Sequence, residues 1–355
     1  MNADGTLGKR NDVRCAGIES KLGIHGSPTC TMIYGDEGGA IGYLIGEENR
    51  GLNAMFTMMN AARLGVGLQG VAIGERAFQL ALAYAKERKQ GRSLTTKSEA
   101  TSAIIEHADI RRMLMLMRAK TDAARAICYM TAAAIDHAHR ETNAQKKKHA
   151  EERAALLTPV AKSWSTDIGI EVASLGIQIH GGMGFIEASG AAQHLRDARI
   201  AAIYEGTNGI QAIDLVTRKL IVSDGQAVTD LIRDSMDVLD ALDESNRPGF
   251  GTTSAHLSDA LGAFERASLL MMNAVKTKPA EALASATAYQ TLFGITLGGV
   301  ALVKAALADQ GPSAERRIAI AKFFAEQIAP ETIGLERIVN EAASALSSSD
   351  AVLSV

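Results

Sequence analysis

The feature that most constrains the fold is a succession of long segments, from Gly51 onward, in which apolar residues recur at helical spacing. The segment Leu52 to Lys89 shows it plainly, because Phe78, Leu82 and Ala85 share one face while polar residues occupy the other. Aromatic residues make up only 4% of the chain, whereas alanine, leucine, isoleucine and methionine abound. This composition favours packed helices over a β-sandwich.

Three further segments predict a helical bundle. Helices are expected over Lys97 to Glu141, over Ala154 to His180, and directly after Glu205. The charged run at 143–153 is expected to be a solvated turn between the second and third helices. Four long antiparallel helices with short connections indicate an up-down bundle, which we place at residues 49–223. The fold class expected for the whole chain is therefore mainly α.

The two ends of the chain follow other patterns. Residues 1–48 predict a short β remnant, with strands at Val13 to Ile18, Thr29 to Tyr34 and Ala40 to Ile45 separated by glycine-containing turns. Three strands without a helix make a poor independent domain, so they either pack on another part of the chain or are the remainder of a larger sheet. Residues 224–355 predict an additional helical domain of roughly five helices.

Charge, cysteines and motifs exclude several classes of function. The 37 Lys and Arg against 40 Asp and Glu give a formal net charge of -3, which provides no attraction to nucleic acid or to an anionic membrane surface. The three cysteines are scattered, without C-x-x-C spacing, which suits a reducing compartment. We find no signal-peptide pattern and no apolar run long enough to span a bilayer, so we expect no membrane span and a cytoplasmic location. His137 and His139 point to different sides of a predicted helix, so no metal site is expected.

One carboxylate has an unusual setting. Glu205 lies between the apolar run Ile200 to Tyr204 and a Gly-Thr-Asn-Gly break, after which helical spacing resumes. Thr207 or Asn208 is expected to cap that helix, because a short oxygen-bearing side chain can accept from first-turn amides. Apolar neighbours disfavour the charged carboxylate while the helix start favours it, and this balance suits a general base. A surface glutamate that only complements a helix dipole explains the same spacing.

The segment around Glu205 resembles the acyl-CoA dehydrogenase family. The sequence IYEGTNGIQ is similar to the family's catalytic segment, in which the Glu of Y-E-G-T removes the α-proton of an acyl-CoA thioester. The resemblance implies Glu205 as the base and Gly206 as a substrate contact. It also implies that the backbone amide of Glu205, with a flavin hydroxyl, polarises the thioester carbonyl.

No side chain can accept a hydride, so the reaction requires a flavin or a nicotinamide. The resemblance implies that the cofactor is FAD. Gln178-Ile-His-Gly-Gly-Met-Gly184 is similar to the segment that contacts the adenosine diphosphate portion of FAD, often across a subunit interface, and so Gln178, Gly181 and Gly182 are cofactor candidates. Without the resemblance, these glycines could equally form a plain helix C-cap. They do not form a Rossmann motif, since they follow a predicted helix and lack the G-x-G-x-x-G spacing.

Three more residues match family positions. Arg88 corresponds to an arginine that binds the FAD pyrophosphate. In this chain Gln90 stands where the family usually has Phe before the glycine. The alternative is that Arg88 only complements the dipole at the end of its helix. Thr207 is implied as a further cofactor contact. Arg63 corresponds to an arginine near the catalytic Glu, and its alternative is a partly buried arginine paired with an unidentified acid.

The resemblance extends along most of the chain. The segments KLGIHGSPTC and YLIGEENRGL resemble the end of the family's middle β-domain and the entry to its C-terminal helical domain. We therefore expect a truncated form that lacks the N-terminal helical domain and the first half of the β-domain. Residues 224–355 resemble the extra helical domain of larger members, such as those acting on 3-methylmercaptopropionyl-CoA or on long-chain acyl-CoA. Implied partners are an acyl-CoA substrate, an electron-transfer flavoprotein, and further copies of the chain in a homodimer or homotetramer.

A second function of a different class fits the same sequence. An open half-sheet leaves unpaired backbone groups, which tend to recruit another chain. The alternative is therefore a non-catalytic helical assembly module, left after truncation of such an enzyme.

Overall fold

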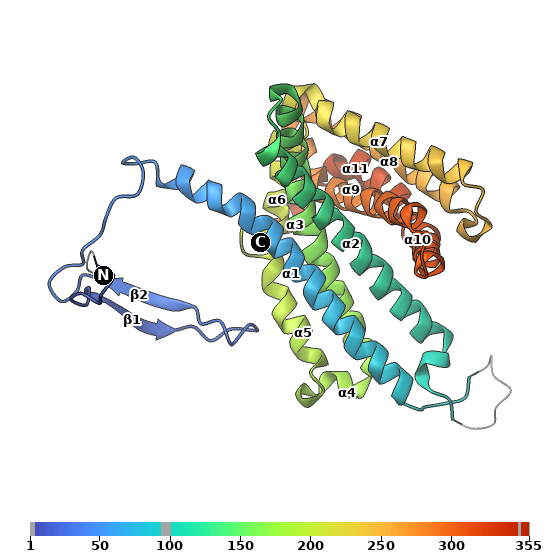
Figure 1. Ribbon diagram of the computed structural model, residues 1–355, viewed down its shortest axis with the longest axis horizontal. Helices are drawn as coiled ribbons and strands as arrows, with labels where there is room; N and C mark the ends of the chain where they lie inside the picture. Colours follow the sequence, from blue (N-terminus) through green and yellow to red (C-terminus); the bar gives the residue numbers. More distant parts are fainter. Residues whose placement is uncertain (1–3, 94–100, 347–348, 355) are drawn as a thin grey trace. The chain divides into compact units, whose positions relative to one another are not determined.

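The structure, a computed structural model, describes residues 4–93, 101–346 and 349–354 and is mainly α-helical, as expected (Figure 1). The chain divides into two compact units, residues 1–60 and 61–355. Helix α1 (Gly51–Glu87) begins in the first and continues in the second.

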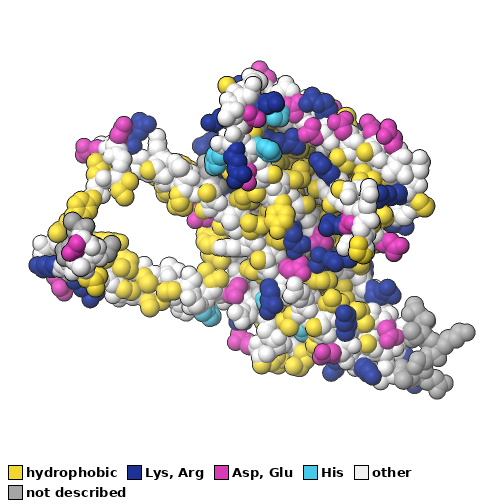
Figure 2. All heavy atoms as spheres, viewed as in Figure 1, with side chains coloured by type: hydrophobic (Ala, Val, Ile, Leu, Met, Phe, Trp, Pro, Cys, Tyr) yellow, Lys and Arg dark blue, Asp and Glu magenta, His cyan; other side chains and the backbone are white. Residues whose placement is uncertain are grey.

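The N-terminal unit contains one antiparallel hairpin. Strands β1 (Val13–Ile18) and β2 (Cys30–Tyr34) pair with a register shift between Cys15 and Gly17. The unit also carries many exposed apolar side chains, visible in yellow in Figure 2.

The third strand expected at residues 40–45 is absent from the described hairpin, so this prediction is wrong. The side-chain amide of Asn11 hydrogen-bonds to both backbone polar groups of Ile41. Its Nδ2 donates to the Ile41 carbonyl at 2.8 Å, and its Oδ1 accepts from the Ile41 N–H at 2.9 Å. Because a side chain rather than a strand satisfies these groups, the segment runs beside the hairpin without joining its ladder.

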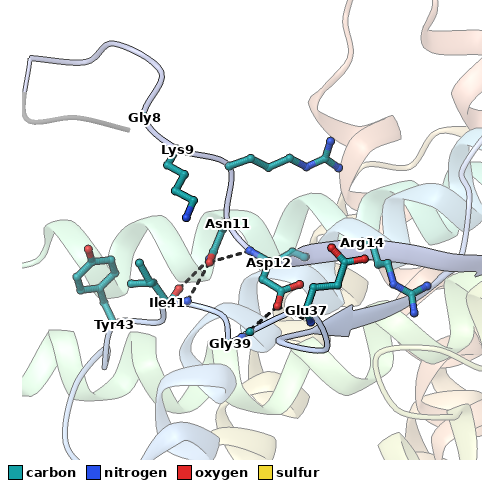
Figure 3. A pocket seen from close by; sticks show the side chains of 12 residues that line it. Gly8, Lys9, Asn11, Asp12, Arg14, Glu37, Gly39, Ile41 and Tyr43 are labelled. Carbon is teal, nitrogen blue, oxygen red and sulfur yellow. Dashed lines mark hydrogen bonds between the residues drawn. The ribbon is translucent and has the colours of Figure 1, made fainter.

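These contacts form one wall of a hollow within the N-terminal unit (Figure 3). The hollow has a volume of about 870 Å³ and lies between residues 8–14 and the turn at 37–43. Asp12 Oδ2 accepts from the N–H groups of Glu37 and Gly39 at 2.8 and 3.1 Å, and so fixes the turn. None of the residues that we expect in the catalytic or cofactor site lines this hollow.

Three long helices, α1, α2 (Ala108–Arg140) and α3 (Ala144–His180), form the first half of the helical unit (Figure 1). The predicted start of the second helix at Lys97 lies outside the described residues, and a 3-10 turn, η1 (Ile104–Glu106), precedes α2. The charged run at 143–153 is not a turn, which corrects the prediction. Asn143 caps α3 by accepting from the N–H groups of Gln145 and Lys146, and the charged residues lie on the exposed first turns of that helix.

Several short helical pieces connect α3 to the turn that contains Glu205. The chain passes through α4 (Gly182–Phe185), η2 (Glu187–Ser189), α5 (Ala191–Ala198) and η3 (Arg199–Ala202). After the turn that contains Glu205, α6 (Asn208–Asp214) continues as the π-helical turn η4 (Leu215–Lys219). The helix expected directly after Glu205 is therefore confirmed, although it is shorter than α1, α2 and α3. The positive φ angles of Glu205 and Gly206 form the predicted break before it.

The second half of the helical unit contains a helix near each of the five predicted segments, which confirms this prediction. After η5 (Val222–Gly225), these are α7 (Gln226–Glu244), α8 (Thr253–Thr277), α9 (Pro279–Ala308), α10 (Ala314–Gln327) and α11 (Glu331–Leu346), with η6 (Pro248–Phe250) before α8 and a short α12 (Asp350–Leu353) at the end.

Helix α9 is the centre of this second half. Among the described helices it is the one that is long and apolar enough to cross a membrane, with a mean hydropathy of 1.8, so the expectation that no such stretch exists is wrong. Its most apolar stretch is 72% buried inside the protein, a pattern that the core helix of a globular domain also shows. Trp164 of α3 packs directly on Gly294 and Gly298 of α9 and so joins the two halves.

Candidate active site

Glu205 occupies a turn between η3 and α6, in a backbone conformation that is rare for its residue type. Its φ angle is +57°, in the left-handed region, which costs a residue with a side chain about 1–2 kcal/mol. Its side chain is half-buried, and among the described residues no hydrogen bond or ion pair ends on its carboxylate. Strain of this kind is a reason to suspect function, and a carboxylate without partners is available to a ligand.

The residues that follow Glu205 fix the turn. Gly206 has φ +86°, and a Cβ atom there would lie 2.8 Å from Nε2 of Gln211, so the position requires glycine. Gln211 is fully buried, and its Nε2 donates to the carbonyls of Glu205 and Gly206 at 3.2 and 3.4 Å. The Oγ1 of Thr207 accepts from the N–H of Ile210 at 3.3 Å, which confirms Thr207 as the N-cap.

Arg63 is buried where α1 contacts α6, the helix that follows this turn. Its Nη1 is 3.5 Å from Oδ2 of Asp214, and both side chains are about nine-tenths buried. The unidentified acid of the alternative interpretation is therefore Asp214. In the described part of the chain, the buried Nε of Arg63 has no hydrogen-bond partner. The charges of Arg63 and Glu205 both act on the buried amine of Lys162, so Arg63 belongs to the electrostatic surroundings of the turn.

The cofactor candidates gather at a different place, where α1 and α3 both end. Tyr84 of α1 stacks on His180 of α3 with 4.4 Å between ring centroids, and this contact brings Arg88 to the same end of the bundle as Gly181. Arg88 is exposed, and among the described residues it forms no ion pair, its Nη2 donating only to Oε1 of Gln90 at 3.4 Å.

Gln178, Gly181 and Gly182 are exposed at this end of the bundle, while Ile179 and His180 between them are buried. A Cβ atom at Gly181 or Gly182 would meet no atom within 4 Å, so their backbone is open to approach. The N–H of Gly181 donates to the carbonyl of Gln178 at 3.1 Å, so the plain C-cap also exists. Cap and ligand contact do not exclude each other here, because the glycines keep an open face.

The two groups of candidates do not lie together within one chain. Lys162, which contacts the Glu205 turn, and Gln178 lie on the same helix 16 residues apart, and at 1.5 Å per residue this is about 24 Å. The structure thus brings Arg63, Glu205, Gly206 and Thr207 to one region and Arg88, Gln178, Gly181 and Gly182 to another.

Sequence reasoning missed three residues at the Glu205 turn: Lys162, Gln211 and Asp214. Lys162 had a usable signal, because it is a single cation within a run that includes Leu156, Leu157 and Trp164, where a charge requires a partner. Gln211 and Asp214 had none, since polar residues four and seven positions after the Gly-Thr break are also expected on a solvated helix face.

Comparison with known proteins supports a family assignment. Residues 49–220 match the family "Acyl-CoA dehydrogenase, C-terminal domain", and residues 228–350 match "Acetyl-CoA dehydrogenase C-terminal like". A 3-methylmercaptopropionyl-CoA dehydrogenase of Ruegeria pomeroyi is 39% identical over 338 residues, which cover 92% of this chain and 56% of that protein. A butyryl-CoA dehydrogenase of Syntrophomonas wolfei is 30% identical over 361 residues, which cover 96% of this chain and 58% of that protein. The chain thus spans somewhat over half the length of these curated relatives.

Solved structures show the same fold. Caenorhabditis elegans ACDH-11 in complex with C11-CoA has a TM-score of 0.74 at 18% identity, over 96% of this chain and 55% of that one. An acyl-CoA dehydrogenase complexed with FAD from Bacillus anthracis has a TM-score of 0.74 at 20% identity, over 92% of this chain and 56% of that one. The chain therefore carries the C-terminal helical domains of the acyl-CoA dehydrogenase family.

Proposed function

We propose that this chain takes part in the FAD-dependent α,β-dehydrogenation of an acyl-CoA thioester, with Glu205 as the base that removes the α-proton. The observation that carries the proposal is the half-buried carboxylate of Glu205, free of partners among the described residues and held in a left-handed turn. The relatives named acyl-CoA, butyryl-CoA and 3-methylmercaptopropionyl-CoA dehydrogenases support the reaction class.

The residues of the turn supply two parts of this chemistry. The carboxylate takes the α-proton, and proton transfer by a positioned side chain contributes about 10²–10⁴-fold to a rate. The backbone N–H of Glu205 donates to the thioester carbonyl oxygen, where negative charge develops. Gly206, which has no side chain, leaves room for the substrate, and Arg63 places a buried positive charge in the electrostatic surroundings of the turn.

The exposed group at the ends of α1 and α3 fits a dinucleotide cofactor in its chemistry. Arg88 offers a planar set of donors without a carboxylate partner among the described residues, and Gly181 and Gly182 offer open backbone at the same end of the bundle. We propose that these residues and Gln178 hold the diphosphate portion of FAD, and that Thr207 contacts the cofactor near the base. Bound FAD would supply the hydride acceptor that no side chain provides.

The separation of about 24 Å along α3 favours a cofactor site shared between subunits. In a homodimer or homotetramer, the base of one chain and the glycine segment of its neighbour can serve the same cofactor. We propose this arrangement, with an electron-transfer flavoprotein as the acceptor that reoxidises the enzyme.

The test is the visible spectrum of the purified chain after incubation with FAD and removal of excess cofactor. We expect a retained flavin spectrum that is bleached under anaerobic conditions by an acyl-CoA, with butyryl-CoA and 3-methylmercaptopropionyl-CoA as the first substrates tried. A colourless protein that takes up no FAD would contradict the proposal and would favour the non-catalytic assembly module. Retained flavin without bleaching by any acyl-CoA would contradict the proposed reaction alone.

A further inference from the structure

A buried lysine donates two hydrogen bonds to residues that follow Glu205. Lys162 is on α3 and has 0% of its surface exposed, which is rare for a lysine. Its Nζ donates to the carbonyl oxygen of Gly206 at 2.8 Å and to Oδ1 of Asn208 at 2.9 Å. A single amine therefore holds the turn on both sides of Thr207.

The same stretch of α3 holds the other end of the Asn208 side chain. The Nδ2 of Asn208 is within hydrogen-bond distance of three oxygens: the Ser163 carbonyl at 3.1 Å, Thr166 Oγ1 at 3.0 Å and Asp167 Oδ1 at 2.7 Å. The amide is thus fixed at both its oxygen and its nitrogen. Together with the Gln211 contacts to the carbonyls of Glu205 and Gly206, these bonds set the direction of the backbone that carries the carboxylate.

Charged groups surround the amine on several elements. Burial lowers the pKa of Lys162 to about 8. The negative charges of Asp167 on α3 and of Glu205 raise the pKa, whereas the positive charge of Arg63 on α1 lowers it further. A neutral amine keeps two N–H donors, and the two oxygens that Lys162 contacts can accept both. The two contacts with the turn therefore persist on either side of the pKa.

We propose that Lys162 is a positioning residue for the dehydrogenation: by holding the Gly206 carbonyl and the Asn208 side chain, it fixes the direction of the Glu205 carboxylate and backbone amide. This proposal rests on the proposed function of Glu205. Lys162 does not contact the reacting atoms. A misplacement of about 1 Å in such a site can cost about 10²-fold in rate, so small movements of the turn have a large effect.

The main test compares two buried lysines. Lys162→Met removes the donors and keeps a long side chain. The matched control is Lys120→Met, because Lys120 is also buried, pairs with Glu171 at 2.7 Å and, among the described residues, does not hydrogen-bond to the turn. We expect Lys162→Met to lower kcat roughly 10–100-fold with KM changed less than about threefold, and Lys120→Met to change both less than about threefold.

A second readout does not depend on activity. Backbone amide hydrogen exchange, measured by mass spectrometry on the full chain without substrate, should be faster for residues 206–211 in Lys162→Met than in the wild type. Exchange over α8 and α9 should be unchanged. In Lys120→Met, exchange at residues 206–211 should match the wild type. If Lys162→Met fails to fold, Asn208→Ala carries the same test, because it removes one of the two acceptors and all three bonds to α3.

The outcomes separate the two proposals. Unchanged exchange at residues 206–211 in both Lys162→Met and Asn208→Ala, with a wild type that is bleached by acyl-CoA, would overturn the positioning role and leave the reaction standing. Equal loss of kcat in Lys162→Met and Lys120→Met would also overturn it, since general stability would then explain the effect. If the wild type holds flavin but no acyl-CoA bleaches it, the reaction assignment is wrong and the positioning proposal falls with it.

Discussion

At the scale of single residues, the site combines a strained carboxylate with a buried amine that holds its turn. Glu205 adopts φ +57°, and Gly206, directly after it, adopts +86°. The strain is maintained by bonds from Lys162 and Gln211, neither of which belongs to the turn itself. A strained backbone conformation that is held in place by interactions with surrounding residues is typical of functional sites.

The strain at Glu205 predicts a difference between two substitutions that both remove the carboxylate. Glu205→Gly should be more stable than Glu205→Ala by about 1 kcal/mol, because glycine adopts positive φ without the Cβ penalty. Chemical denaturation measures the two free energies of unfolding. Equal stabilities, or a more stable alanine variant, would show that the left-handed conformation is not held in solution.

The lowered pKa of Lys162 predicts a pH dependence of stability. The pKa is about 8 in the folded chain against 10.5 for an ordinary lysine, so between these values the unfolded chain binds one more proton than the folded chain. Stability should therefore rise with pH in this window. The free energy of unfolding of the wild type, relative to Lys162→Met, should increase from about pH 8 to 10.5. A relative stability that is flat or falls across this range would contradict the burial of the charge.

At the scale of elements, the site depends on how closely α1 and α3 cross. A Cβ atom at Gly70 of α1 would overlap the carbonyl oxygen of Ser165 on α3, and one at Gly169 of α3 would lie 2.7 Å from the carbonyl of Gly70. These glycines let the two helices approach at the level of Lys162 to Asp167, the stretch that holds the turn. A small change in the crossing would therefore reach Glu205.

Two glycine substitutions on α1 test this crossing. Gly70→Ala should destabilise the chain by about 1–3 kcal/mol through overpacking against α3. Gly65→Ala, on the same helix where a Cβ would meet no atom within 4 Å, should stabilise it by up to about 1 kcal/mol through higher helix propensity. Thermal unfolding followed by circular dichroism measures both. A neutral Gly70→Ala would mean that the two helices do not approach this closely.

At the scale of the whole molecule, the sequence was informative where structure depends on local spacing. The long helices follow from apolar residues three and four apart, and Thr207 as the N-cap follows from its own chemistry. Contacts between distant segments were not accessible: Lys162 and Asn208 are 46 residues apart, and Arg63 and Asp214 are 151 apart. The prediction of a third strand failed for the same reason, because the hydrogen bond between Asn11 and the backbone of Ile41 joins residues that are 30 positions apart.

The continuous core of the helical unit predicts cooperative unfolding. Buried residues from α2 and α3 and from α7 to α11 form one apolar cluster, and Trp164, 4% exposed, packs on α9. Tryptophan fluorescence, which reports Trp164 alone, and far-ultraviolet circular dichroism should therefore show coincident transitions in denaturant. Two separated transitions would mean that residues 224–355 form an independent folding unit.

The proposed dehydrogenation depends on Glu205 acting as the base, and the rate of flavin bleaching by an acyl-CoA measures this most directly. In stopped-flow experiments on the FAD-loaded protein, we expect Glu205→Gln to retain the bound flavin spectrum and to bleach about 10²–10⁴-fold more slowly than the wild type. A Glu205→Gln protein that bleaches within about tenfold of the wild-type rate would show that Glu205 is not the base and would contradict the proposed reaction.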